Sequence, residues 1–370
     1  MHLNEGVFMR RSVSLFIAVS AILIVCVASA TACGGYRALE FDPTSDYGLY
    51  WYGDGASDAD VVRASEGTDV EYFDPSKPTV LYFHGWKSGS SNDRVTKVED
   101  LRTPANSGYT AEEFDVVEYY KRQGYNVGAM SWYRGASSLN QLFGYIWSDL
   151  VWDGASQGKS LAYAFASELA HVFRDYEGEI TFVGHSYGTQ AAVAVNYLLA
   201  KYADADRLPG RAVVASRMSL ADPYIGDLAV SDQDLTKRIC GVDEKLNGRK
   251  PAQLFADCVN YLATRHNVVT DVYCGMPLAY DQYADKDKIF PQLTANTAWV
   301  VLEALQDKHG KVGEIHNITR DFMLLSARYD LGDVPSMHAS NQTIRACMGK
   351  QYVLASGDLH SVGTARIVEA

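Results

Sequence analysis

Residues Ile180–Gly188 read ITFVGHSYG, and this stretch decides the fold. Its first four residues are an apolar run with β-forming side chains, which is typical of a buried strand. The run ends in the pattern G-x-S-x-G centred on Ser186, and the Ala- and Leu-rich residues Gln190–Ala203 predict a helix after it. Strand, sharp turn and helix form a nucleophile elbow, because the turn raises the serine hydroxyl above the sheet.

With this motif in place, residues 77–222 resemble the α/β-hydrolases, and the C-terminal third resembles them less closely. The resemblance implies an α/β-hydrolase fold: a mostly parallel sheet with helices on both faces and a helical cap or insertion. It also implies a triad in the chain order Ser, Asp, His. The expected organisation is a signal peptide at 1–32, an N-terminal flap or edge segment at 33–76, a first core part at 77–225, a cap or insertion at 226–315 and a second core part at 316–370.

The N-terminus has the pattern of a secretory signal peptide. Met9-Arg10-Arg11 is a basic region, the residues 12–30 are mostly apolar, and two A-x-A cleavage patterns follow at 28–32. The expected location is therefore extracellular. An uncleaved membrane anchor is one alternative, and a lipidated Cys33 is another, because residues 30–34 loosely resemble a bacterial lipobox.

Cysteine usage is consistent with export, since Cys33 and four cysteines in the second half remain after signal removal. The expected disulfides are Cys240–Cys258 and Cys274–Cys347. Buried free thiols are the alternative for all four.

Composition limits the partners and cofactors. The chain has 370 residues, of which 47% are hydrophobic, so it can bury a large core. Its net charge of −12 and the lack of a basic stretch argue against nucleic acid as a partner. No H-E-x-x-H, C-x-x-C or Gly-rich phosphate loop is present, so neither a metal nor a nucleotide cofactor is expected. No sequence feature indicates an oligomeric state.

A second buried strand is predicted at Pro78–Phe83 and leads into His84-Gly85-Trp86. In the hydrolases that the chain resembles, a strand that ends in His-Gly positions a backbone amide for the oxyanion hole. The resemblance therefore implies an oxyanion hole made by the amides of Trp86 and Tyr187. His84 itself is expected to be a hydrogen-bonded structural residue.

A candidate acid follows the next predicted strand, Arg211–Leu220, in the sequence Asp222-Pro223. A carboxylate at the carboxyl end of a parallel strand lies at the edge where sites of α/β proteins form. The context resembles that of the pancreatic-type lipases, whose triad acid follows this strand.

The general base must be one of three downstream histidines: His316, His338 or His360. Two acid–base pairings remain open. Asp222 with His338 fits a strand count in which Ile318–Ala327 is the third strand after the elbow, and His338 then precedes a helix as in pancreatic-type lipases. Asp330 with His360 has the spacing of many capped α/β-hydrolases. We favour Asp222 and His338, because only ten residues follow His360.

These residues predict a secreted serine hydrolase of the lipase or esterase type, acting on carboxylic esters through an acyl-enzyme. The substrate is a small-molecule or lipid ester. The aromatic stretch Leu139–Trp152 forms either a lid or acyl-binding wall, with contact to a lipid surface, or a buried amphipathic helix. Two other functions stay open: a peptidase or amidase on the same triad, and a non-catalytic binding protein on a hydrolase scaffold.

Overall fold

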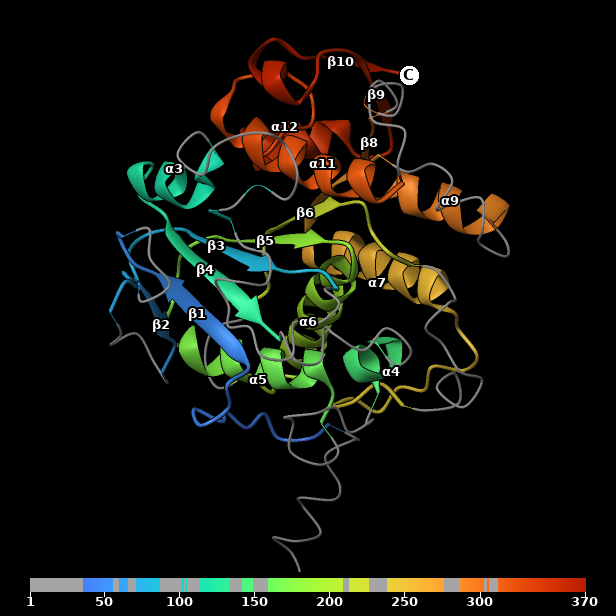
Figure 1. Ribbon diagram of the computed structural model, residues 1–370. Coiled ribbons are helices and arrows are strands. Elements are labelled where there is room, and N and C mark those ends of the chain that lie inside the picture. The colour runs from blue at the N-terminus through green and yellow to red at the C-terminus, as the bar shows by residue number, and fades with distance from the viewer. Residues whose placement is uncertain are drawn as a thin grey trace, which may run out of the picture.

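A single ten-stranded sheet runs through the molecule in the order β10-β9-β8-β7-β6-β5-β3-β4-β1-β2 (Figure 1). The computed structural model describes residues 36–55, 60–65, 71–86, 101–102, 104, 114–132, 142–148, 159–208, 213–225, 238–275, 286–302, 305 and 312–370. The predicted signal peptide, Cys33 and both ends of the aromatic stretch at 139–152 lie outside the described residues.

Strands β3 to β9 run parallel to one another and form the centre of the sheet, whereas β1 and β2 at one end and β10 at the other pair antiparallel. The strands are β1 Gly48–Tyr52, β2 Val61–Arg63, β3 Thr79–Phe83, β4 Asn126–Ser131, β5 Ile180–His185, β6 Arg217–Ala221, β7 Val269–Cys274, β8 Ala298–Val301, β9 Gln351–Ser356 and β10 Arg366–Glu369.

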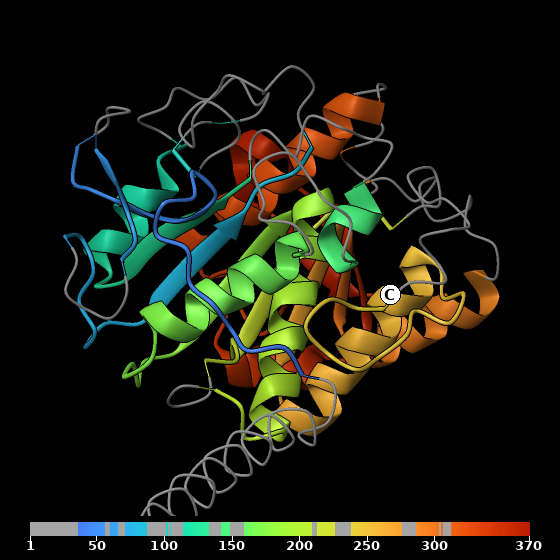
Figure 2. The ribbon, with the colours of Figure 1, turned by 90° about the horizontal axis from the view of Figure 1, so that it is seen from below.

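Helices cover both faces of the sheet (Figure 2). The helices are α3 Val116–Arg122, α4 Leu142–Trp147, α5 Leu161–Val172, α6 Tyr187–Asp204, α7 Pro251–His266, α9 Lys286–Ala295, α11 Val312–Leu325 and α12 Asn341–Cys347, with 3₁₀ turns η7 Ser326–Arg328 and η8 Leu359–Thr364. Helices α4 to α7 and α9 pack on one face, and α3, α11 and α12 pack on the other. Within the described ranges, no helix combines the length and the apolar composition needed to cross a bilayer.

Burial on both faces explains why the central strands read as continuous apolar runs. In β3, Leu81 and Phe83 enter the core under α5 and α6, while Val80 and Tyr82 enter the core on the opposite face. Strands β3, β5 and β6 and helix α6 lie where the sequence predicted them. The expected edge hairpin in the N-terminal segment is formed by β1 and β2.

The structure corrects the expected cap at 226–315. This segment supplies β7 and β8, which pair in parallel with β6 and β9 and extend the sheet itself. The sequence of Thr294–Lys308 predicts a helix, and this prediction is wrong, because α9 ends at Ala295 and β8 follows. The predicted strand Ile318–Ala327 is also wrong, since most of it belongs to α11. The apolar residues of α11 recur at intervals of three and four, which is the helical period: Ile315, Ile318, Phe322 and Leu325.

The expected disulfides are not formed. Cys240, Cys258, Cys274 and Cys347 are all buried, and none of the four is in a disulfide. Burial raises the pKa of the Cys258 thiol well above its usual range, so that this side chain stays neutral and behaves as a small apolar group.

Candidate active site

The turn between β5 and α6 holds Ser186 in a strained conformation, with φ of 54° and ψ of −125°. A positive φ is unfavourable for a residue with a side chain and persists only where its surroundings hold it. Here Ser186 N–H donates to Ala221 O at 3.0 Å, and the Thr189 hydroxyl donates to Ser186 O at 2.6 Å. A Cβ atom at Gly188 would overlap the carbonyl oxygens of Phe83 and His84, which explains the second glycine of the motif.

A strained serine between a parallel strand and a helix, at the carboxyl edge of this sheet, is the nucleophile elbow. The chain has an α/β-hydrolase fold. The predicted strand-turn-helix context of the motif is therefore confirmed.

Asp222 lies directly after β6 and is almost fully buried, with 1% of its side chain exposed. Its backbone is also strained, with φ of 45°, and its N–H donates to Tyr273 O at 2.7 Å. Gly275 N–H donates to Oδ1 of the carboxylate at 3.1 Å, and Nδ1 of His316 lies 2.6 Å from Oδ2. A buried carboxylate bonded to an imidazole is the arrangement that orients a general base.

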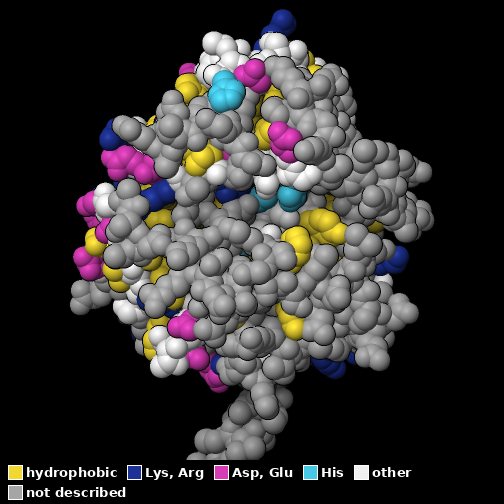
Figure 3. Space-filling model, viewed as in Figure 1, with side chains coloured by type: hydrophobic (Ala, Val, Ile, Leu, Met, Phe, Trp, Pro, Cys, Tyr) yellow, Lys and Arg dark blue, Asp and Glu magenta, His cyan; other side chains and the backbone are white. Residues whose placement is uncertain are grey.

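His316 comes from the first half of α11, whose N-terminal turns lie at the carboxyl edge of the sheet. Because Nδ1 donates its proton to Asp222, the neutral ring has its lone pair on Nε2, where it can accept a proton. The side chain remains 18% exposed and can meet a substrate. Figure 3 shows histidine side chains at the surface of this face, beside hydrophobic ones, over the carboxyl end of β5 in Figure 1.

The predicted oxyanion residues lie at the same edge. Phe83 of β3 pairs with Gly184 of β5, so Trp86 and Tyr187 each lie three residues beyond this pair. Tyr187 is the first residue of α6, where a helix presents backbone N–H groups and partial positive charge. The Trp86 side chain is 40% exposed. The two residues are therefore brought to one level of the sheet edge.

His338, the favoured base, is not brought to Asp222. Its Nδ1 lies 3.2 Å from Ala327 O. The surrounding loop is held at the opposite edge of the sheet, because Arg217, the first residue of β6, donates to the carbonyls of Ser336 and Ala339. Asp222 lies five residues farther along, about 16 Å at the rise of an extended strand. His316 therefore replaces His338 as the partner of Asp222.

The other pairing is not formed either. Asp330 is exposed and accepts the Gly332 amide at 2.9 Å, and His360 is exposed in η8. Within the described residues, no contact joins the two side chains.

His316 is one of the three candidate bases in the sequence, but a strand at 318–327 would place it at the edge of the sheet opposite to Asp222. A strand there carries the chain from one edge of the sheet to the other and brings the loop after it to the carboxyl edge. A helix antiparallel to the strands carries the chain in the opposite direction, so the first residues of the helix lie at the carboxyl edge. The helical period of α11 was the signal that could have located His316.

His84 is structural, as predicted. Its Nε2 accepts the Trp132 N–H at 3.1 Å, which leaves Nδ1 protonated to donate to Gly85 O at 2.9 Å. The Trp132 indole N–H in turn donates to His84 O. These bonds join the ends of β3 and β4 and support the segment that leads to Trp86.

The described part of the aromatic stretch is a buried helix. In α4, Ile146 and Trp147 are buried. The Trp147 indole N–H donates to Gln190 Oε1 at 3.3 Å, and the Gln190 amide donates to Tyr224 O at 2.6 Å. Tyr224 N–H reaches Ser186 O at 3.3 Å. Helix α4 is thus connected to the elbow.

His185 contacts the backbone and the ring of His316. Its Nε2 lies 3.2 Å from His316 O, and the two rings lie 4.5 Å apart at 39°. Since a carbonyl can only accept, Nε2 of His185 carries the proton. The contact ties the strand that positions the nucleophile to the turn that positions His316.

We expect His185→Ala to lower kcat roughly 10- to 100-fold with KM nearly unchanged, because a small displacement of the base costs rate rather than binding. His185→Gln keeps a donor and is expected to recover part of the loss. Steady-state kinetics on a p-nitrophenyl ester measures both. Equal losses in the two variants would contradict this role, and unchanged thermal unfolding serves as the control.

No protein-family model and no curated protein matches this chain. Among solved structures it is similar to esterase B from Lactobacillus rhamnosis, with 16% identity, a TM-score of 0.32 and coverage of 78% of this chain and 83% of that one. A lipase-esterase related protein from Clostridium acetobutylicum is 13% identical, with a TM-score of 0.27 and coverage of 62% and 87%. A Mycobacterium tuberculosis puromycin-hydrolyzing peptidase is 15% identical, with a TM-score of 0.31 and coverage of 65% and 33%. Identities this low leave the function to be argued from the chain's own site.

Proposed function

We propose that this protein is a serine hydrolase that cleaves carboxylic esters through Ser186, His316 and Asp222. The observation that carries the proposal is the 2.6 Å contact between buried Asp222 and His316 at the sheet edge where the strained Ser186 lies. Ser186 and Asp222 also both have positive φ, an unfavourable conformation for residues with a side chain that the surrounding structure must hold in place.

The reaction begins when His316 Nε2 takes the proton of the Ser186 hydroxyl, which then attacks the ester carbonyl carbon. Asp222 stabilises the imidazolium that forms and holds the ring in place. The amides of Trp86 and Tyr187 are the proposed donors to the oxyanion. His316 then protonates the leaving alcohol, and a water molecule, activated by the same base, releases the acid from the acyl-enzyme.

An apolar acyl group is favoured by the surroundings of the site. The large Trp86 side chain is exposed beside the proposed oxyanion hole, and hydrophobic side chains lie next to the histidines on the same face (Figure 3). We therefore propose small-molecule or lipid esters as substrates. Export directed by residues 1–32 is a further part of the proposal and is supported by the sequence pattern alone.

A serine-directed fluorophosphonate probe tests the proposal. We expect one adduct per chain, located on Ser186 by mass spectrometry, because the activated hydroxyl attacks phosphorus as it attacks a carbonyl. Ser186→Ala is expected to abolish labelling. Thr189→Ser, which keeps the hydroxyl that bonds Ser186 O, is the matched control and is expected to label normally.

Failure of the wild-type protein to react would contradict the proposal and favour a binding protein on a hydrolase scaffold. Normal labelling together with cleavage of peptide amides but not of esters would instead identify a peptidase or amidase.

A further inference from the structure

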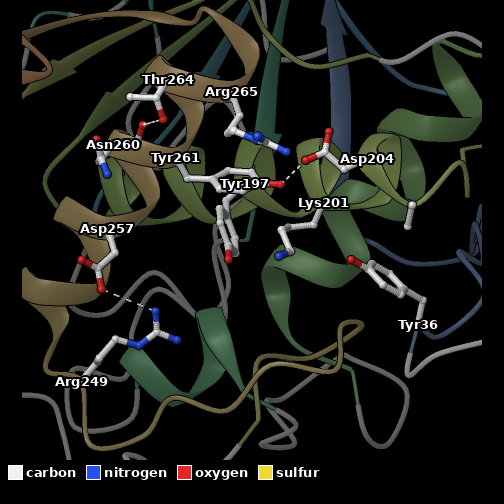
Figure 4. Close-up of a pocket in the computed structure, with 11 residues that line it drawn as sticks. Tyr36, Tyr197, Lys201, Asp204, Arg249, Asp257, Asn260, Tyr261, Thr264 and Arg265 are labelled. Atoms are coloured by element: carbon white, nitrogen blue, oxygen red, sulfur yellow. Dashed lines mark hydrogen bonds and ion pairs between the residues drawn. The ribbon is translucent and has the colours of Figure 1, made fainter.

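A cavity of about 730 Å³ lies at the end of α6 that is farthest from Ser186 (Figure 4). It is lined by one face of α6, one face of α7, Tyr36 and Arg249. Since a helix rises 1.5 Å per residue, Lys201 lies about 22 Å from Ser186 along the axis of α6. The volume is in the range of small-molecule sites, roughly 300–1,000 Å³. The cavity is therefore separate from the proposed active site.

The acceptors of this cavity are already engaged by donors of the protein. Asp204 accepts the Tyr261 hydroxyl and lies 3.2 Å from Nε2 of His266. Asp257 accepts side-chain amides from Gln253 at 2.7 Å and Gln292 at 2.9 Å. Both carboxylates thus already have donor partners within the protein.

Arg249 is engaged as well. It donates to Glu244 at 2.7 Å and lies 3.5 Å from Asp257, and Glu244 also accepts the Tyr197 hydroxyl at 2.5 Å. Its charge is thus compensated within the wall of the cavity.

Several donors have capacity to spare. Lys201 Nζ lies 5.8 Å and 5.2 Å from the ring centroids of Tyr197 and Tyr261, and its distance of 3.8 Å to the Glu244 carboxylate is too long for a hydrogen bond. Arg265 is exposed and points toward Asp204 (Figure 4). Within the described part of the chain, no hydrogen bond or ion pair engages the Arg265 guanidinium. Two cationic donors of the cavity, Lys201 and Arg265, therefore have hydrogen-bonding capacity to spare.

We propose that this cavity binds a small organic anion, a carboxylate or a phosphate ester that carries a flat apolar group. Its acidic group bonds Lys201 and Arg265, because both offer N–H donors and positive charge. Its apolar group packs against Tyr36 and Tyr261, which are partly buried and line the cavity. The site shares no residue with the proposed hydrolase, so the two proposals stand or fall separately.

Isothermal titration calorimetry with four probes at low ionic strength tests the ligand class. We expect benzoate or phenyl phosphate to bind. Benzamide, the neutral counterpart of benzoate, is expected to bind with an affinity lower by about 10-fold or more. Whichever of benzoate and phenyl phosphate binds more tightly identifies the acidic group. Inorganic phosphate is expected to bind more weakly than phenyl phosphate, because it lacks the apolar group.

Variants locate the site. Lys201→Met keeps the apolar stem over the tyrosine rings and is expected to weaken the preferred anion about 10-fold, whereas Lys201→Arg stays within about 3-fold of wild type. Lys350→Met, which removes an exposed lysine on the far side of the sheet, is the matched control. Ser186→Ala is expected to bind like wild type. Equal binding of benzamide and benzoate, an unaffected Lys201→Met variant, or no binding of any probe would overturn the proposal.

Discussion

Replacement of His316 by glutamine is expected to lower kcat/KM for a p-nitrophenyl ester by roughly 10⁴-fold or more, whereas the same change at His338 stays within about 2-fold. Glutamine cannot take a proton from Ser186, so the first variant lacks its general base. His338 lies at the opposite edge of the sheet and bonds Ala327 O, a contact that glutamine can also make.

The comparison distinguishes His316 from His338 as the general base, because the two substitutions are chemically identical. Circular dichroism and thermal unfolding of both variants exclude misfolding as the cause. A collapse of activity in His338→Gln with an active His316→Gln would mean that the loop carrying His338 reaches the carboxyl edge, contrary to its bonds with Arg217. His360→Gln provides a third comparison and is expected to stay active.

Asp271→Asn is expected to lower the free energy of unfolding by about 3–5 kcal/mol, because it leaves the charge of Arg217 buried and unpaired. The two side chains form a bidentate pair inside the sheet, with Nε and Nη2 of Arg217 each 3.0 Å from a carboxylate oxygen. Their side chains are 6% and 0% exposed. Burial disfavours the charged guanidinium, but the Asp271 carboxylate outweighs it and raises the pKa of Arg217.

Urea unfolding followed by circular dichroism measures the loss. Glu118→Gln is the matched control, since Glu118 makes an exposed pair with Arg122 and its loss is expected to cost less than about 0.5 kcal/mol. The double variant Arg217→Met/Asp271→Leu removes both charges and is expected to recover much of the stability. A single variant as stable as wild type would show that the guanidinium finds other compensation, such as the carbonyls of Ser336 and Ala339.

The elbow and its surroundings were predictable because their signals are local. Two glycines, a serine, an apolar run and an Ala-rich run specify strand, turn and helix within about 25 residues. The position of Asp222 was equally accessible, since the end of one strand beside the elbow strand lies at a known edge of a parallel sheet.

The partner of Asp222 was not accessible in this way. Its identity depends on how many strands and helices carry the chain across the sheet between residues 226 and 340. If one of these elements is assigned wrongly, every later loop is predicted at the wrong edge of the sheet. The short β8 lies within a segment that the sequence predicts as a helix, and the second half of α11 lies within a predicted strand. Local patterns distinguish such short apolar segments poorly, because burial on both faces removes the period that separates helix from strand.

The amino-acid sequence alone thus predicted the elbow at Ser186, a carboxylate at the end of the next strand and a parallel α/β core, since each is indicated by a local sequence pattern. Only the tertiary structure decided that His316 is the partner of Asp222, that the four buried cysteines form no disulfide and that residues 226–315 extend the sheet. Those outcomes depend on contacts between residues far apart in the chain, such as Asp222 and His316, and local sequence patterns carry no information about which distant residues meet.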